Sequence, residues 1–307
     1  MPPVAVVLVA VAAVLHLAWN VLLKTAGDPL RTAAIGIGLA GLAFAPLAAL
    51  GWWLGGRPAV TPEAFFLAAL SGALEVGYFV LLSAAYRRGD LSVVYPIARG
   101  TAPLLAVGAG VLLLGERLSA GGWLGVGLLL GGLVALQRPW RLLRRSARSG
   151  AGDSAVPFAI ATGVLIAAYS AVDRVGVRLV APWLYGALLW VAMSVGLAAV
   201  VAVRDRRLHQ AAERTEAFHP AGSAEAVDVR RAAVGGFLTL VAYLLVLGAL
   251  AVAPLAAVAP LRESAVVLAS GWGVLRLGEA AGRGDATRRI GAAGLVLGGA
   301  ALLALGG

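Results

Sequence analysis

Long apolar stretches, separated by short polar breaks, follow one another along the whole chain. A bilayer core about 30 Å thick takes roughly 20 residues of helix to cross. Ten stretches of about that length cover residues 4–23, 32–54, 65–86, 91–114 and 121–136 in the first half, and 157–180, 183–203, 232–252, 255–277 and 290–305 in the second. Barrel strands would alternate polar and apolar residues, and these stretches do not. The pattern predicts an all-α integral membrane protein with ten transmembrane helices.

The composition agrees with this class and excludes several others. Of the 307 residues, 61% are hydrophobic and 13% are charged, whereas an ordinary soluble domain has about 45–50% apolar and about 25% charged residues. The chain has no cysteine, which excludes disulfide scaffolds and cysteine-built metal sites, and its three histidines are too scattered for another metal site. No phosphate-binding loop of the Walker type is found, which argues against an ATP-driven pump. We expect no metal and no cofactor.

The formal net charge of +10 is explained by a membrane surface, because arginines crowd the polar breaks between the apolar stretches. The connections after odd-numbered helices hold nineteen Lys and Arg residues, and those after even-numbered helices hold only Arg57 and Arg117. The positive-inside rule then predicts that both termini lie outside the cell. The longer polar segments 138–156 and 204–231 are interpreted as a linker and a loop, and no nucleic-acid partner is expected.

The two halves of the chain repeat one another. Leu114-Gly115-Glu116 recurs 163 residues later as Leu277-Gly278-Glu279, and the same offset maps Arg99 onto Arg262. Because each half has five spans, the second copy must enter the membrane from the opposite side. The prediction is two inverted five-helix repeats, residues 1–137 and 157–307, which is an architecture typical of secondary transporters.

Several segments resemble the EamA-type carriers of the drug/metabolite transporter superfamily. They are His16-Leu-Ala-Trp19-Asn20-Val-Leu-Leu-Lys24, Tyr95-Pro96-Ile-Ala-Arg99-Gly100 with Gly115-Glu116, and Pro260-Leu-Arg262-Glu263-Ser264 with Gly278-Glu279. The resemblance implies transport across the inner (plasma) membrane, usually export, of small metabolites such as amino acids without ATP. Carriers of this family are usually drawn with both termini in the cytoplasm, which is opposite to the orientation that the arginine count predicts.

Charged residues inside the apolar stretches are the candidate substrate site. A charged side chain at bilayer depth costs about 2.5–3.5 kcal/mol on insertion scales, so it normally faces the protein interior or water. Arg99 and Arg262 are predicted to clamp an anionic group. Glu75 and Glu263 are predicted to balance that charge, bind an amine or carry a proton. The structural alternative is ion pairing of Glu75 with Arg99, or of Glu263 with Arg174. Asp173 and Arg174 are predicted either to take part in coupling or to form a structural ion pair.

Other polar and aromatic residues extend this candidate site. His16, Asn20 and Lys24 share one face of the first helix, with Trp19 beside it. Tyrosine hydroxyls and rings are predicted to line the same cavity, with packing as the alternative: Tyr78, Tyr95, Tyr169 and Tyr243. Prolines at 96, 103, 254 and 260 are predicted to break or kink the fourth and ninth helices near their arginines.

The sequence favours a secondary active transporter that exports small polar or amphipathic metabolites, such as amino acids, by alternating access. Its expected partners are a small-molecule substrate and the lipid bilayer, and proton coupling is compatible with the buried acids. One alternative is a membrane-embedded enzyme that acts on a lipid-linked substrate with Glu75 and Glu263 as acid and base. Another is a membrane subunit that does not transport. Substrate identity, coupling ion, direction of transport and oligomeric state stay open.

Gly36-Ile-Gly38-Leu-Ala-Gly41 matches a dinucleotide-binding pattern. It lies within an apolar stretch with no preceding strand, so we reject a dinucleotide site there.

Overall fold

A computed structural model describes residues 1–24, 26–88, 91–138, 155–214, 227–263 and 283–305, and within them the chain is built of helices. The elements are α1 (Pro3–Lys24), α2 (Pro29–Leu54), α3 (Pro62–Arg88), α4 (Leu91–Gly108), the π-helical turn η1 (Ala109–Leu113), α5 (Ala120–Gln137), α7 (Ala155–Gly176), α8 (Pro182–Arg214), α9 (Val229–Val252), α10 (Leu255–Arg262) and α12 (Arg283–Leu305). Helices occupy the first eight predicted stretches and the tenth. Of the ninth stretch, α10 forms the start, and residues 264–277 lie outside the described part of the chain.

The distribution of side chains is that of a membrane protein. Five of the described helices, α2, α3, α7, α8 and α9, are long and apolar enough to cross a bilayer. Large apolar side chains point outward, with Leu42 75%, Phe66 63% and Leu112 82% exposed, while Glu75, Asp173 and other polar residues are buried. An apolar shell around a polar interior matches a lipid environment. The predicted all-helical class is confirmed for the described residues, and their apolar surface is consistent with a membrane protein.

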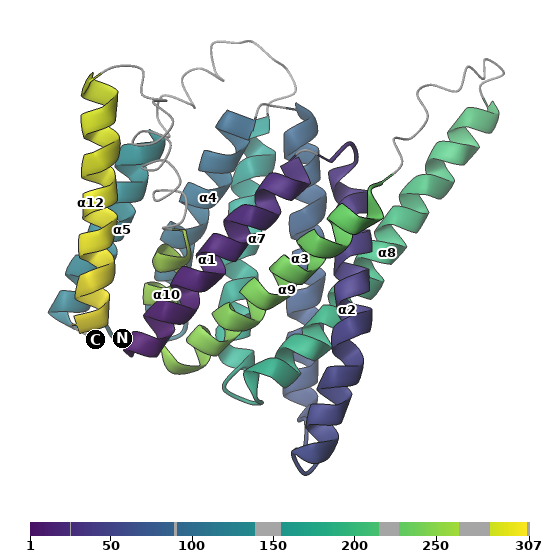
Figure 1. Cartoon of the computed structure of the whole chain (residues 1–307), viewed down its shortest axis with the longest axis horizontal. Coiled ribbons are helices and arrows are strands. Elements are labelled where there is room, and N and C mark those ends of the chain that lie inside the picture. The colour runs from purple at the N-terminus through teal and green to yellow at the C-terminus, as the bar shows by residue number, and fades with distance from the viewer. Residues whose placement is uncertain (25, 89–90, 139–154, 215–226, 264–282, 306–307) are drawn as a thin grey trace.

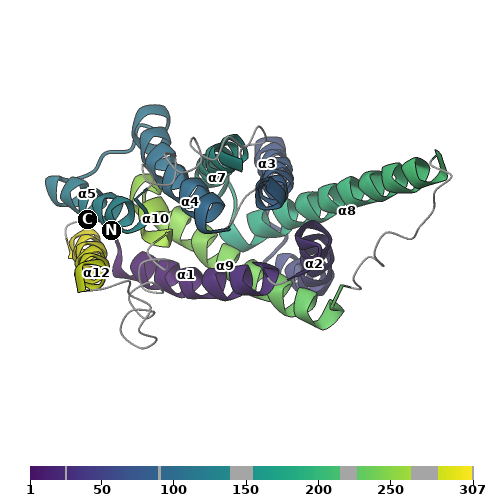
Figure 2. The same cartoon turned by 90° about the horizontal axis from the view of Figure 1, so that it is seen from above.

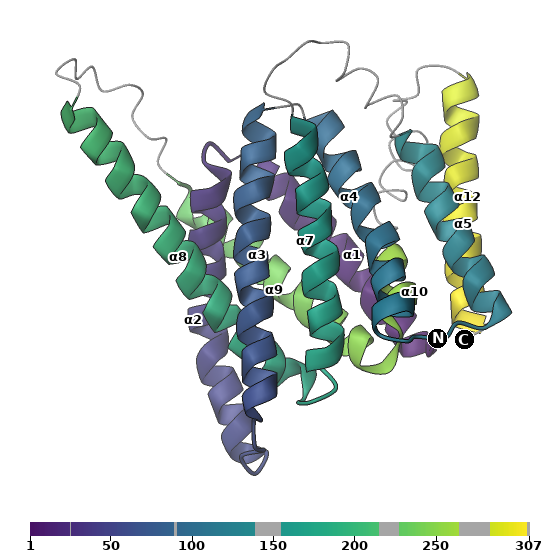
Figure 3. The same ribbon diagram turned by 180° about the vertical axis from the view of Figure 1, so that it is seen from behind.

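The most extensive helix contacts join the first half of the chain to the second. Helix α1 packs on α9, α2 on α8 and α9, α3 on α7 and α8, α4 on α7 and α10, and α5 on α12. Figure 1 shows α5 and α12 side by side at one end of the molecule, with both chain termini at the same side, and Figure 3 shows the same pairing from behind. In Figure 2, α10 lies between α4 and α1. The two halves therefore form one interleaved bundle.

Glycines allow α2 to approach its neighbours closely. A Cβ atom added at Gly36 would collide with the carbonyl oxygen of Ala232 on α9, and one added at Gly236 would collide with the backbone of Gly36. On the other side of α2, the Trp190 indole of α8 donates a 3.0 Å hydrogen bond to the Ile37 carbonyl. Small residues of this kind let membrane helices touch backbone to backbone.

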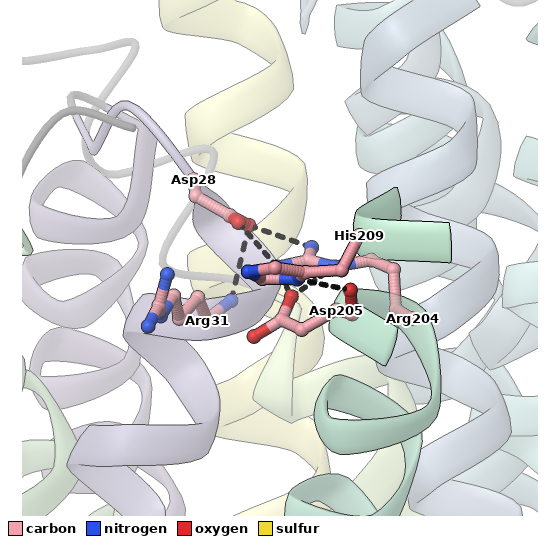
Figure 4. A network of polar contacts seen from close by, with 5 residues as sticks. All are labelled: Asp28, Arg31, Arg204, Asp205 and His209. Atoms are coloured by element: carbon pink, nitrogen blue, oxygen red, sulfur yellow. Dashed lines mark hydrogen bonds and ion pairs between the residues drawn. The ribbon is translucent and has the colours of Figure 1, made fainter. Parts of the chain in front are cut away.

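Asp28 ties the start of α2 to the long helix α8 (Figure 4). Its carboxylate caps α2 by accepting from the Arg31 N–H at 3.1 Å, and it accepts two hydrogen bonds from the Arg204 guanidinium at 3.1 and 2.6 Å. Arg204 also bonds Asp205, and His209 contacts the Asp205 carbonyl oxygen at 2.7 Å. Partial burial alone would raise the pKa of Asp28, but the hydrogen bonds and charges of Arg204 and Arg31 outweigh it and hold that pKa below its ordinary value.

Asp28→Asn is expected to lower stability by at most about 1 kcal/mol, because partly exposed ion pairs contribute about 0–1 kcal/mol and asparagine still caps the helix. Asp28→Ala also loses the cap, at a further cost of about 1 kcal/mol. A depressed carboxyl pKa stabilises the folded state above that pKa, so the Asn effect should disappear as the pH falls through it. Thermal unfolding of the purified protein in detergent across a pH series measures both. An Asn effect as large as the Ala effect, or one that persists in acid, would contradict this account.

Candidate functional site

The short helix α10 carries two of the predicted site residues to the centre of the bundle. It starts after Pro254 and ends at Arg262, with Glu263 as the residue that follows its last turn. All eight residues of α10 are buried, and Glu263 is 2% exposed. A helix that begins and ends inside the protein leaves unpaired N–H groups at its start. Those groups need partners from elsewhere in the fold.

Glu116 supplies the partners. Its carboxylate accepts from the Leu255 N–H at 2.8 Å and the Ala256 N–H at 2.9 Å, and from Arg174 Nε at 2.9 Å. Arg174 in turn donates to the Leu250 carbonyl at 2.5 Å, near the end of α9. The acid therefore caps α10 from the first half of the chain and pairs with the Arg174 charge at that helix start.

The backbone before Glu116 is shaped to place it there. The π-helical turn η1 ends α4, and Gly115 follows with φ +65°, a conformation that favours glycine. At Gly110 a Cβ atom would collide with the Glu116 carboxylate and come within 3.1 Å of the Ala256 nitrogen. The motif Leu114-Gly115-Glu116 thus positions α10, and through it the site residues at the end of that helix.

The first group of site residues, which we call the arginine cluster, consists of His16, Arg99, Ser170, Arg262 and Glu263. Arg99 Nη1 bonds both carboxylate oxygens of Glu263, at 3.0 and 3.2 Å. Arg262 bonds the same carboxylate through Nε at 3.3 Å and the Ser170 hydroxyl through Nη1 at 3.3 Å. His16 Nε2 contacts the Arg99 guanidinium, and because a guanidinium only donates, this ring nitrogen is the acceptor. Both predicted clamp arginines therefore converge on one glutamate of the protein itself.

The second group, the carboxylate cluster, consists of Ser71, Glu75, Asp173, Tyr185 and Tyr243. Asp173 accepts from Ser71 at 2.5 Å and Tyr185 at 3.1 Å on one oxygen, and from Tyr243 at 2.5 Å on the other. Glu75 lies near Asp173 and Tyr243 in the same cluster. One oxygen of Glu75 is buried without a hydrogen-bond partner among the described residues.

Aromatic rings join the two clusters. The Tyr169 ring lies 6.2 Å from Tyr78 and 6.3 Å from Tyr243, and Trp190 lies 6.1 Å from Tyr243. Trp19 packs edge-on against Phe79, with ring centroids 6.1 Å apart, and is 3% exposed, so it contributes packing beside the clusters. The clusters are thus parts of one buried polar layer with aromatic walls.

Several contacts and helix ends differ in the structure from those expected from the sequence. Arg99 pairs with Glu263 and not with Glu75, and Arg174 pairs with Glu116 and not with Glu263. Asp173 and Arg174 form no ion pair with each other, since neighbours on a helix point about 100° apart. Pro96 and Pro103 do not end α4, which continues to Gly108. The side chains of Asn20 and Tyr95 lie outside the described residues.

The sequence reasoning missed four contributors to the site, namely Ser71, Glu116, Ser170 and Tyr185. A signal existed for two of them. Ser71 precedes Glu75 by four residues and so shares its helix face. Glu116 lies in the motif that recurs in the second half. Tyr185 and Ser170 carried no such signal, because only the packing of α8 and α7 brings them to these clusters.

Buried, paired charges from several helices in an apolar bundle are typical of a membrane transporter. Residues 3–137 match the EamA-like transporter family, and this confirms the resemblance to the drug/metabolite transporter superfamily.

The chain is also similar to small export proteins. It is 41% identical over 68 residues to the spermidine export protein MdtI of Enterobacter sp. (strain 638), and 40% identical over 68 residues to that of Shigella flexneri. Each match covers 22% of this chain and 62% of the relative. The chain therefore spans less than two thirds of the length of these curated relatives. A crystal structure with 21% sequence identity has the same fold at a TM-score of 0.63, covering 98% of this chain and 99% of the other.

Proposed function

We propose that this protein is a secondary active exporter of small polar or amphipathic metabolites, with its substrate site at the arginine and carboxylate clusters. The observation that carries the proposal is the buried ion pair between Arg99 of α4 and Glu263 at the end of α10. It joins the two halves of the chain at the point where each half supplies an arginine. An ion pair of this kind is weak support for stability but a natural place to bind a charged substrate.

An inverted repeat is supported by the pattern of helix contacts. Exchanging the halves pairs α1 with α7, α2 with α8, α3 with α9, α4 with α10 and α5 with α12. Under that exchange the α1–α9 contact becomes the α7–α3 contact, and α2–α9 becomes α8–α3. The contacts α2–α8, α4–α10 and α5–α12 map onto themselves. Such a dyad allows one half to take up the arrangement that the other has left, which is alternating access.

The charges favour substrates that carry an ammonium group. The two arginines of the site are both engaged by Glu263, whereas Glu75 and Asp173 have no basic partner among the described contacts. Amino acids and polyamines both present an ammonium, and the spermidine-exporting relatives agree with the second class. A substrate carboxylate would compete with Glu263 for the arginines, and an ammonium would compensate Glu75 or Asp173.

We propose that the arginine-rich end of the bundle faces the cytoplasm and the termini lie outside. The ends of α1, α3 and α8 and the starts of α2, α9 and α12 gather at the end opposite the termini (Figure 1). The termini end holds Arg57 and Arg117, and also Arg178 in the turn after α7, which the count of connections left out. The end opposite the termini still holds more Lys and Arg residues, so the positive-inside rule favours this orientation.

Replacing Arg99 or Arg262 by glutamine is expected to reduce transport roughly 30-fold or more, because truncating one partner of a buried charge pair costs about 2–5 kcal/mol. The assay is counterflow of labelled spermidine and labelled amino acids into liposomes that contain the purified protein. Arg206→Gln, which removes an exposed arginine of α8, is the matched control and should transport like wild type. Wild-type counterflow of every labelled substrate in both variants would overturn the assigned site.

The enzyme alternative receives no support from the geometry. It required Glu75 and Glu263 to work together in a cleft open to lipid. The two acids are 5% and 2% exposed, and Glu263 is paired with Arg99 and Arg262, whereas one oxygen of Glu75 has no hydrogen-bond partner among the described residues.

A further inference from the structure

Helices α2 and α8 stand at the end of the bundle away from α5 and α12 (Figure 2), and a groove runs along the outer surface between them. It consists of two cavities, of about 400 and about 330 Å³, that share Gly41, Ala45 and Val191 in their walls. Small residues at helical spacing on α2 leave room for it, namely Gly41, Ala45, Ala48 and Ala49. Larger residues line the α8 side, namely Leu184, Leu188, Val191 and Val195. We call this feature the α2–α8 groove.

The α2–α8 groove has an apolar wall and opens toward the apolar outer surface. Its wall includes Trp190, which is 1% exposed and donates its indole N–H to the Ile37 carbonyl at 3.0 Å. The Ser194 hydroxyl is directed at the same carbonyl, at 3.5 Å. On the open side, Val191 and Val195 are 53% and 65% exposed. Because these polar side chains already have partners, the groove favours a hydrocarbon chain over a polar metabolite.

The dimensions of the groove match one lipid chain. From Gly41 to Trp52, α2 rises about 17 Å at about 1.5 Å per residue, and one leaflet of the hydrocarbon core is about 15 Å thick. The two helices are in contact, and helices in contact have axes about 8–10 Å apart. A third helix is about 10–12 Å wide with its side chains, so it cannot enter between them. An extended acyl chain is the occupant that this length and width favour.

The end of the groove at the turn after α2 carries a cation. Trp52 holds this turn twice, because its carbonyl accepts from the Arg57 N–H at 2.9 Å and its indole N–H donates to the Pro58 carbonyl at 3.0 Å. Arg57 has a φ of +55°, which residues other than glycine seldom adopt, and its guanidinium carbon lies 3.8 Å from the centre of the Trp53 ring. Among the described residues, no acidic side chain forms an ion pair with Arg57. The fold therefore places a guanidinium without a counter-charge at the mouth of an apolar groove.

We propose that the α2–α8 groove binds an anionic phospholipid, with one acyl chain along the groove and the lipid phosphate at Arg57. A planar guanidinium matches the geometry of a phosphate, and tryptophans such as Trp52 and Trp53 are typical of the depth at which lipid headgroups lie. A lipid with a net negative charge supplies the counter-charge that Arg57 lacks. The groove shares no residue with the arginine and carboxylate clusters, so this site does not depend on the proposed transport function.

Native mass spectrometry of the full-length protein, released from detergent with added dioleoylphosphatidylglycerol, measures the phosphate contact. Wild type should retain this lipid, and dioleoylglycerol, which has the same chains without a phosphate, should bind about tenfold more weakly or worse. Dioleoylphosphatidylcholine, whose own ammonium offsets its phosphate, should bind with intermediate affinity. Arg57→Gln should weaken binding of dioleoylphosphatidylglycerol by about tenfold, because the charge-assisted hydrogen bonds are lost. Arg117→Gln removes another exposed arginine at the same end of the bundle, and this matched control should bind like wild type.

A second pair of variants tests the groove itself. Ala45→Phe places a ring in the part that both cavities share, so it should also weaken binding of dioleoylphosphatidylglycerol by about tenfold or more. Ala43→Phe adds the same ring at a position of α2 outside the groove and should bind like wild type. Both alanines are exposed, so neither ring disturbs the packing of the bundle.

Three results would overturn the lipid site. They are wild-type binding in Arg57→Gln or Ala45→Phe, equal binding of the three lipids, and a lipid-free wild-type dimer that dissociates in Ala45→Phe. In the last case the groove would hold a second copy of the chain.

Discussion

Glu263→Leu is expected to destabilise the protein by about 3–5 kcal/mol, because it leaves Arg99 and Arg262 buried without their common counter-charge. Both guanidiniums stay charged under all conditions, so the site cannot relax by losing a proton. With roughly 2 °C for each kcal/mol in chains of this size, the melting temperature in detergent should fall by several degrees. Thermal unfolding followed by loss of a monodisperse peak on size-exclusion chromatography measures the effect.

The control is Glu63→Leu, which removes an exposed acid from the first turn of α3 and should cost no more than about 1 kcal/mol. In the double variant Arg99→Leu/Glu263→Leu, part of the loss should be recovered, because one of the two orphaned charges is gone. Equal melting temperatures for Glu263→Leu and Glu63→Leu would mean that the two arginines do not depend on Glu263.

The sequence located the charged residues at depth because their cost in lipid is independent of the fold. Arg99, Arg262, Glu75 and Glu263 all lie where apolar stretches made them conspicuous, and all are buried. Their partners were not predictable in the same way. Whether Arg99 reaches Glu75 or Glu263 depends on the rotation of α3 and α4 about their axes and on where α10 ends, and a rotation of one residue moves a side chain by about 100°.

The prolines and the Gly-Glu motif likewise show that local patterns predict positions in the chain but not the contacts made in the fold. Pro254 marks the start of α10, as expected of a residue that lacks an N–H group. Pro96 and Pro103 lie within α4 and do not end it, because helix neighbours in a bundle can hold a helix across a missing bond. Glu116 was visible only as half of a repeat. Its task depends on α10, which is 139 residues away in the chain, and no local pattern encodes that contact.

Gly36→Ala is expected to destabilise the bundle by about 1–3 kcal/mol or more, because the new methyl group meets backbone and not a movable side chain. Its Cβ atom would collide with the Ala232 carbonyl oxygen and lie 3.2 Å from the Gly236 nitrogen, so α2 and α9 would have to separate. The Gly36-x-Gly38-x-x-Gly41 pattern is thereby explained by packing: Gly36 faces α9, and a Cβ atom added at Gly41 would lie 3.0 Å from Trp190 and 3.1 Å from Ser194 of α8.

Gly38→Ala is the matched control two residues away on the same helix. Nothing lies within 4 Å of its added Cβ atom, so the variant should keep the roughly 1 kcal/mol that alanine gains over glycine in a helix and unfold at or above the wild-type temperature. The propensity gain is common to both variants, and the gap between their melting temperatures therefore isolates the α2–α9 contact. Since α9 carries Tyr243 to the carboxylate cluster, Gly36→Ala should also lower counterflow of labelled substrate, while Gly38→Ala leaves it intact. Two variants of equal stability would show that α2 and α9 do not approach as closely as this fold requires.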